Sequence, residues 1–216
     1  MCGRYANHVE AMQAWADILG DWPADLPTGY NVAPTQPVPV LTPQGWQASR
    51  WGLIPGWAKE ISGKYATFNA RLESVASKPS FRSAWRRGQR CLIPALGYYE
   101  WRDDHGVRQP WFVHDADGNP LVFAGLWDRH ESQSGSLHSC TVITRPANTR
   151  MSDLHDRMPV MLTPDQGIEW LSPDCRDPDG LCQDDQVVTS FHPVSRAVNN
   201  ARHQGADLIQ PVSLQT

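Results

Sequence analysis

Residues 90–102 read Arg-Cys-Leu-Ile-Pro-Ala-Leu-Gly-Tyr-Tyr-Glu-Trp-Arg, and this stretch decides the fold class. It holds two apolar and aromatic segments of strand length, Arg90–Pro94 and Gly97–Arg102. Four further segments of this kind follow, at Pro110–His114, Leu121–Trp127, Ser139–Thr144 and Val187–Phe191. The sequence therefore predicts an α+β fold built on a curved antiparallel sheet or open barrel.

Turn and helix signals complete this outline. Asp103–Gly106 and Asp117–Pro120 are typical of tight turns, and the stretch from Ser132 to Ser136 is typical of a loop. Six prolines between Pro23 and Pro43 predict an extended or looped segment. The other expected elements are helices at His8–Leu19 and about 80–88, a strand at Gln47–Leu53, a short helix opened by Asp165–Glu169, and a last ordered element at Val194–Asn199.

The chain is 216 residues long, which suits one large domain. We expect a single domain over 1–216, with a core of about 2–200 and a tail of about 201–216. No apolar run approaches the roughly 20 residues that span a bilayer. The five cysteines are odd in number and include no CxxC pair, so we expect a reducing cytoplasm, no disulfide framework and no structural zinc.

Charge is strongly segregated along the chain. The formal net charge is −4, but residues 50–90 hold nine basic and two acidic side chains, a balance of +7. Residues 165–185 hold seven acids and one base, a balance of −6. The low overall charge therefore does not exclude a polyanionic partner such as DNA, although charge clusters usually form solvated faces.

Cys2 carries the most distinctive chemistry, because it follows the initiator methionine. Removal of Met1 leaves one residue with both an α-amine, pKa about 7.7–8.0, and a thiol, pKa about 8.5. Such a 1,2-aminothiol condenses with an aldehyde to a Schiff base, and the thiol then closes a stable five-membered thiazolidine. The alternative is an incidental cysteine near a frayed terminus.

Three other segments hold groups that suit this chemistry. Asn69 and Arg71 combine an amide that can orient a substrate with an arginine that can grip phosphate. Glu100 lies among aromatic residues, where desolvation favours general acid–base work. His155, two residues before Arg157, can exchange protons near pH 7. Each segment also has an ordinary reading, as a helix cap, a solvated strand glutamate and a loop histidine respectively.

Eight segments together resemble the SRAP (SOS-response-associated peptidase) family. They run in the family's order from residue 2 to about 200, and they are Met1–Arg4, Tyr30–Thr35, Trp51–Pro55, Asn69–Glu73, Arg90–Pro94, Tyr99–Trp101, Ala124–Trp127 and His155–Val160. The resemblance implies a sensor of abasic sites in single-stranded DNA, which it captures as a covalent DNA–protein crosslink. It also implies a thiol autopeptidase, although here only Met1 precedes Cys2.

The resemblance also assigns roles to individual residues. Cys2 forms the crosslink, Asn69 orients the opened sugar, Glu100 shuttles protons, and His155 assists ring opening and crosslink reversal. Arg4, Arg71 and Arg157 match positions used on DNA phosphates, and Pro34, Trp51 and Trp101 lie in segments that line the DNA groove. The expectation is a cytoplasmic monomer, nucleoid-associated when DNA is damaged, without membrane, metal or cofactor.

Three competing readings stay open from the residues alone. An N-terminal-nucleophile amidohydrolase of the glutamine amidotransferase type would use Cys2 on an amide, with the α-amine as base. A non-enzymatic single-stranded DNA-binding module would bind without regard to abasic sites. A papain-like protease with Cys91 or Cys140 is remote, because both cysteines lie in expected strands.

Overall fold

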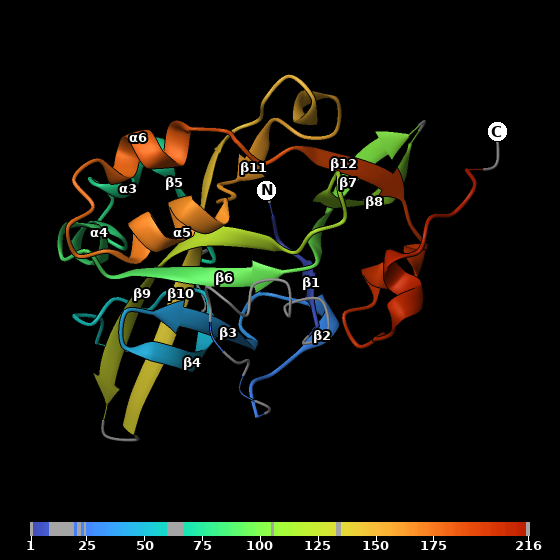
Figure 1. Ribbon diagram of the computed structural model, residues 1–216. Coiled ribbons are helices and arrows are strands. Elements are labelled where there is room, and N and C mark those ends of the chain that lie inside the picture. The colour runs from blue at the N-terminus through green and yellow to red at the C-terminus, as the bar shows by residue number, and fades with distance from the viewer. Residues whose placement is uncertain are drawn as a thin grey trace.

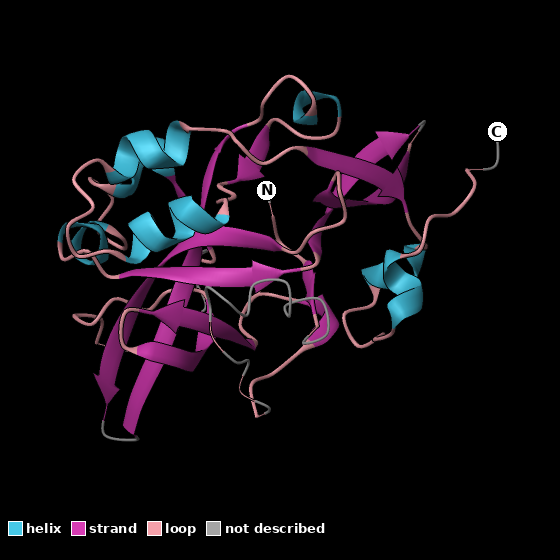
Figure 2. Cartoon of the chain, in the orientation of Figure 1, coloured by secondary structure: helices cyan, strands magenta, loops and turns pink. Residues whose placement is uncertain are grey.

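The structure is a computed structural model that describes residues 2–8, 20, 23, 25–59, 67–104, 106–132 and 135–214. It confirms the α+β class, because strands make up most of the ordered chain and short helices lie at its periphery (Figure 2). The helix expected at His8–Leu19 lies, apart from His8 itself, outside the described residues. Within the part of the chain that the structure describes, no helix is both long enough and apolar enough to cross a bilayer.

Five strands form a small closed barrel. They are β3 (Pro37–Thr42), β4 (Gly45–Trp51), β6 (Arg90–Ala95), β9 (Leu121–Ser132) and β10 (Gly135–Pro146). The strand order is β10-β4-β3-β6-β9, and β9 also pairs with β10, which closes the ring. Inward and outward positions alternate: Cys91 and Ile93 face the interior, whereas Leu92 packs outside. A Cβ on Gly125 would approach the Cys91 sulfur to 2.9 Å, so the crowded interior needs glycine there.

Two short strands extend the barrel along β10. β5 (Asn69–Arg71) pairs with β10 in parallel, and β11 (Arg157–Pro159) pairs with it antiparallel. Both reach the same point of β10, where Thr144 is opposite Arg71 on one side and Pro159 on the other. β10 thus brings two segments together that are more than 80 residues apart in the chain.

A second, five-stranded sheet packs beside the barrel (Figure 1). Its order is β12-β8-β7-β1-β2, with β12 at Thr189–Pro193, β8 at Val107–Asp115, β7 at Gly97–Asp104, β1 at Tyr5–Asn7 and β2 at Gly29–Val32. The expected turn between β7 and β8 is present: Gly106 has a φ of +84°, and its N–H donates to the Asp103 carboxylate at 2.8 Å. The expected turn at Asp117–Pro120 joins β8 to β9.

The helices cover the outside of the two sheets. The α-helices are α3 (Leu72–Val75), α4 (Arg82–Arg86), α5 (Pro164–Leu171) and α6 (Pro178–Gln183), and the 3-10 helices are η2 (Met151–Asp153), η3 (Arg196–Asn199) and η4 (Ala206–Ile209). α5 begins where expected, because Thr163 and Gln166 form a reciprocal capping box. Ordered structure continues past the last expected element, since Leu208 in η4 is fully buried.

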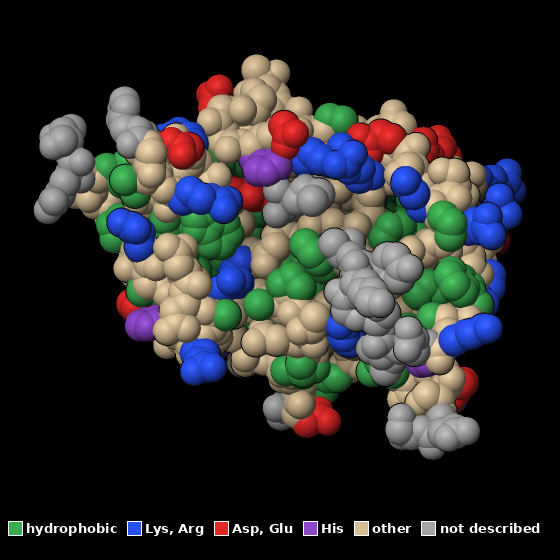
Figure 3. Space-filling view, turned by 180° about the vertical axis from the view of Figure 1, so that it is seen from behind, with side chains coloured by type: hydrophobic (Ala, Val, Ile, Leu, Met, Phe, Trp, Pro, Cys, Tyr) green, Lys and Arg blue, Asp and Glu red, His purple; other side chains and the backbone are tan. Residues whose placement is uncertain are grey.

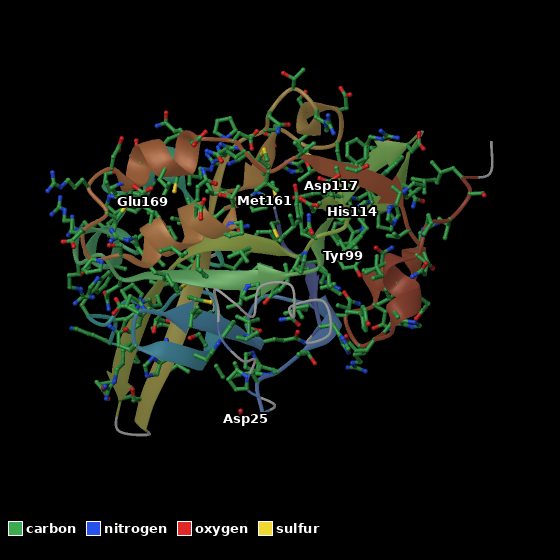
Figure 4. All side chains as sticks on the ribbon, viewed as in Figure 1. Asp25, Tyr99, His114, Asp117, Met161 and Glu169 are labelled. Carbon is green, nitrogen blue, oxygen red and sulfur yellow. The ribbon has the colours of Figure 1, made fainter. Side chains whose placement is uncertain are left out.

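Three apolar clusters hold these layers together. The first fills the barrel and continues to Cys2, Tyr5 and Tyr98 in the second sheet. The second lies between the barrel and the α-helices. The third lies between the second sheet and the C-terminal 3-10 helices and includes Tyr99, whose hydroxyl donates to the Tyr30 carbonyl (Figure 4). Because Tyr98 and Tyr99 are successive strand residues, they serve opposite faces of β7.

The proline-rich segment is more regular than expected. β2 and β3 lie within it, and β3 includes Pro37 and Pro39. Both prolines lie in the part of β3 that pairs with β4, whereas β6 meets β3 only at Leu41. A proline lacks the N–H that a second neighbouring strand would need, so strand pairing on one side accommodates them.

Candidate functional site

Cys2 lies at the junction of the barrel and the second sheet. It is fully buried in the first apolar cluster, and the segment that carries it runs between β11 and the β7–β8–β12 layer (Figure 1). Burial raises the pKa of the Cys2 thiol well above its ordinary value, and the nearby Glu100 raises it further. The thiol is therefore neutral at physiological pH, and a base is needed to activate it.

Asn69 holds the backbone of Cys2. Its side-chain Nδ2 donates to the Cys2 carbonyl oxygen at 2.7 Å, which joins residues 67 positions apart. The same side chain is 9% exposed, and its Oδ1 is buried without a hydrogen-bond partner among the described residues. A buried acceptor that lacks a donor is costly, so this atom is poised to accept from an incoming group.

Glu100 and His155 face each other across the same site. Glu100 is 3% exposed on β7, and burial raises the pKa of its carboxyl, with His155 opposing the shift. The His155 Nε2 lies 4.0 Å from the Glu100 Oε2. That separation is too long for a direct hydrogen bond, and the two groups interact through charge.

The His155 ring has a defined orientation. Its Nδ1 lies 3.0 Å from the backbone nitrogen of Arg157 and 2.8 Å from the Asp156 carboxylate. These two contacts hold the ring with its Nε2 toward Glu100.

Arg157, which the resemblance assigns to a DNA phosphate, has protein partners in this structure. It is 9% exposed and forms a forked ion pair with Glu73: Nη1 to Oε1 at 2.7 Å and Nη2 to Oε2 at 2.9 Å. Nη2 also donates to the Thr144 carbonyl at 2.8 Å. Because both terminal nitrogens are engaged, the guanidinium is not free for phosphate in this structure.

Arg4 and Trp101 line a separate open cavity of about 390 Å³, together with Arg108 and Asn199. Asn199 fixes Trp101, because its Oδ1 accepts the indole N–H at 2.8 Å. Arg4 donates to the Asn31 side chain at 2.7 Å and to the Val198 carbonyl at 3.0 Å. Since Glu100 and Trp101 are neighbours on β7, their side chains point to opposite faces of the strand.

The remaining candidates divide between surface and core. Arg71 is exposed on β5, and Pro34 is partly exposed in the turn before β3. Trp51 is fully buried, with its indole N–H bonded to the Phe68 carbonyl at 2.8 Å and its ring 5.1 Å from that of Tyr5. The structure therefore corrects the expectation for Trp51: its side chain supports the wall of the site and presents no surface to DNA.

Comparisons with known proteins agree with this arrangement. The family described as SOS response associated peptidase (SRAP) matches residues 1–201. The chain belongs to the SRAP family. It is 38% identical to "Abasic site processing protein YoqW" of Bacillus subtilis over 97% of this chain and 99% of that protein. It is 32% identical to "Abasic site processing protein YedK" of Escherichia coli over 98% of this chain and all of that protein.

More distant SRAP proteins share the sequence or the fold. "Abasic site processing protein HMCES" of Gallus gallus is 32% identical over 99% of this chain and 79% of its own length. A crystal structure of a protein from Bordetella bronchiseptica superposes with a TM-score of 0.80 at 27% identity, covering 90% of this chain and all of that one. The β-barrel architecture is therefore shared well beyond close relatives.

The other cysteines of this SRAP chain do not form a second site. Cys91 and Cys140 are fully buried in β6 and β10, and burial raises the pKa of each thiol. All five cysteines are free. Among the residues that the structure describes, no group of three or more His, Cys, Asp and Glu side chains is arranged to hold a metal ion.

One face of the molecule combines charge with apolar groups. In the view from behind Figure 1, Lys and Arg side chains lie around a central region in which hydrophobic side chains gather (Figure 3). Single-stranded nucleic acid binds to such combinations through phosphates and stacked bases.

Three supporting residues were not anticipated from the sequence. Glu73 binds Arg157, Asn31 binds Arg4, and Asn199 binds Trp101. Glu73 and Asn31 lie inside segments that carry the family resemblance, so the sequence marked both residues. It did not indicate which side chains they bind. Nothing in the sequence distinguishes Asn199 from its neighbour Asn200.

Proposed function

We propose that this protein processes abasic sites in single-stranded DNA by trapping them covalently through Cys2. The observation that carries the proposal is the convergence on one buried residue: Asn69 binds the Cys2 backbone, and Glu100 lies close enough to influence its thiol. The curated relatives are themselves named abasic site processing proteins, which supports the same substrate here.

The chemistry begins once Met1 is removed, by an aminopeptidase or by hydrolysis that consumes one water and uses the Cys2 thiol. The free α-amine attacks C1′ of the ring-opened abasic sugar and forms a carbinolamine. Loss of one water gives the imine. The Cys2 sulfur then adds to the imine carbon, its proton passes to the nitrogen, and a thiazolidine results.

Glu100 and His155 move the protons in this scheme. A carboxyl with a raised pKa can donate to the departing hydroxyl and then accept from the thiol, which is the order that imine formation and ring closure require. His155, with Nε2 toward Glu100, supports opening of the sugar ring and, in reverse, release of the crosslink.

Asn69 orients the reacting groups. With its Nδ2 committed to the Cys2 carbonyl, its unpartnered Oδ1 is free to accept from a sugar hydroxyl or from the α-amine. Holding the amine and the aldehyde in one geometry lowers the entropic part of the barrier. The buried acceptor thereby gains the donor that the ligand-free protein lacks.

The DNA strand binds through Arg4, Arg71 and Trp101. Arg71 is exposed one strand position after Ala70, so it lies near Asn69. Trp101 is fixed by Asn199, and a fixed aromatic ring can stack a base without losing side-chain freedom. Because the aldehyde defines the substrate, we expect little preference for base sequence.

The test is the intact mass of the protein after incubation with single-stranded DNA that contains one abasic site. We expect loss of Met1 and a heat-stable adduct one water lighter than protein plus DNA. Cys2→Ala should form no such adduct, and Cys2→Ser should form at most a labile one that borohydride traps. A heat-stable adduct of equal yield with Cys2→Ala would overturn the mechanism.

A further inference from the structure

Arg102 lies on the face of β7 that carries Glu100. Side chains alternate along a strand, so Glu100 and Arg102 share one face and Trp101 lies on the other. The register agrees, because Glu100 is directly opposite Trp111 on β8. A rise of about 3.3 Å per residue places Arg102 about 7 Å from Glu100 along the strand. Arg102 is therefore beside the site around Cys2 and faces away from the cavity that Trp101 lines.

The Trp111 ring holds the Arg102 guanidinium in place. The Arg102 Cζ lies over this ring, 4.3 Å from its centroid, which is a cation–π contact. Phe191 on β12 supports the same ring, with the two aromatic planes at 80° and their centroids 5.6 Å apart. The ring attracts the cation through its face and leaves the guanidinium N–H groups for other partners. An arginine held in this way loses less side-chain freedom when it binds a ligand.

Arg102 has no anionic partner among the residues that the structure describes. Its guanidinium forms neither a hydrogen bond nor an ion pair there, and its ring contact is the interaction it makes. The acidic groups on the same face, Glu100 and Asp104, lie two strand positions away on either side and are outside ion-pair distance. Arg145, in contrast, is paired with Asp185. A partly exposed cation with unengaged donors suits an anion from outside the protein.

We infer that Arg102, resting on Trp111, binds a phosphate of the DNA strand next to the abasic nucleotide. This inference rests on the proposed function of Cys2. The abasic sugar lies between Cys2 and Glu100, and Arg102 follows on the same face of β7, within reach of the neighbouring phosphate. Arg71 belongs to β5 of the barrel sheet, so the two arginines contact the strand from the two sheets that meet at Cys2.

A solvated surface charge at Arg102 makes a different prediction. Such a charge attracts every phosphate weakly and at long range, so its loss weakens binding a little and to the same extent wherever a DNA phosphate is neutral. A direct contact depends on one phosphate only. The position dependence of the effect therefore separates the two roles.

The experiment measures binding of Arg102→Gln and wild type to single-stranded DNA with one tetrahydrofuran analogue of the abasic site. The analogue has no aldehyde, so binding is measured apart from crosslinking. By fluorescence anisotropy we expect affinity to fall about fivefold to tenfold at low salt, and the slope of log K against log salt to fall by about 0.7. Neutral methylphosphonates then replace single phosphates near the analogue. One adjacent replacement should weaken the wild type and leave Arg102→Gln unchanged, whereas replacements elsewhere act on both proteins alike.

Arg129→Gln is the matched control for the loss of one positive charge. Arg129 forms an exposed ion pair with Glu131 at the far end of the β9–β10 hairpin, and its substitution should leave affinity and salt slope unchanged. Trp111→Leu tests the support, because it removes the ring and keeps the Arg102 charge. Adding Arg102→Gln to Trp111→Leu should cost less affinity than adding it to the wild type.

Unchanged affinity of Arg102→Gln, or a loss shared equally by every methylphosphonate position, would overturn the inference. Should Arg102→Gln fail to fold, Arg102→Met applies the same test, because methionine keeps an apolar contact with the Trp111 ring. A wild-type protein that binds the analogue but forms no adduct with a natural abasic site would instead reject the proposed function. The phosphate scan would still decide the role of Arg102.

Discussion

The side-chain amide of Asn69 donates to the carbonyl oxygen of Cys2 at 2.7 Å. This contact ties the N-terminus to β5, and it does so inside an apolar cluster where few other groups could hold a backbone carbonyl. Residues near the N-terminus of a chain are ordinarily among the least ordered. Here a buried hydrogen bond holds Cys2 in place, which is what a nucleophile at position 2 requires.

Asn69→Ala should slow crosslinking by about tenfold to a hundredfold, because loss of a buried hydrogen-bond partner costs about 1–3 kcal/mol. The measurement is a time course of adduct formation on denaturing gels at saturating abasic DNA. Affinity for intact single-stranded DNA should stay the same. Asn119→Ala, in the exposed β8–β9 turn, is the control, and an equal slowing there would refute a specific role for Asn69.

Glu100→Gln should abolish efficient crosslinking and stabilise the fold. Burial raises the pKa of Glu100, so the folded state binds more protons than the unfolded state, and stability is lost as pH rises through the raised pKa. Gln cannot ionise, so it removes the free-energy cost of a buried carboxylate. We expect a gain on the order of 1 kcal/mol at pH 7.5 that disappears near pH 4, measured by urea unfolding. A loss of stability at pH 7.5 would contradict this view of Glu100.

Glu73→Gln should show the opposite dependence on pH. The Arg157 hydrogen bonds lower the pKa of Glu73, so its contribution to stability is full above the ordinary carboxyl pKa and is lost as pH falls through the lowered one. We expect Glu73→Gln to melt below the wild type at neutral pH and to match it in acid. Thermal unfolding between pH 7 and pH 3 checks this, and a difference independent of pH would argue against an ionic contact.

Arg71→Ala should weaken binding of single-stranded DNA and lower its salt dependence. Each phosphate contact that is lost reduces the slope of log K against log salt by about 0.7. Fluorescence anisotropy at several salt concentrations measures both quantities. Arg129→Ala, on the exposed end of the β9–β10 hairpin, should change neither. An unaltered slope in Arg71→Ala would remove Arg71 from the DNA interface.

Substitutions of Trp51 and Trp101 should affect different properties, namely folding stability for Trp51 and DNA binding for Trp101. Trp51→Ala should destabilise the protein by about 3–5 kcal/mol, because the side chain is fully buried. Trp101→Ala should destabilise the protein less, because Trp101 is only partly buried, and should weaken DNA binding by about 1–3 kcal/mol, the contribution of one stacked base. Denaturant unfolding and anisotropy check the pair, and unchanged DNA binding by Trp101→Ala would exclude the stacking role.

The sequence by itself determined several strands and turns and the chemistry of Cys2. Alternation and turn residues are local properties, so β6, β7, β8, β9, β10 and β12 were predictable, although β9 extends to Ser132. The three-residue strands β1, β5 and β11 were not predicted, because so short a segment shows no alternation. The family could also be recognised from the sequence, because eight short segments in a fixed order form a specific pattern. The aminothiol of Cys2 is a covalent property that needs no fold to recognise it.

Only the tertiary structure decided which groups meet and which are free. Asn69 reaches Cys2 because β5 pairs with β10 beside the N-terminus. Arg157 is engaged by Glu73, and Trp51 is buried, although both looked available for DNA in the sequence. The reason is physical: the partner and the exposure of a side chain depend on strands brought together from distant parts of the chain, and a linear pattern holds no record of that pairing.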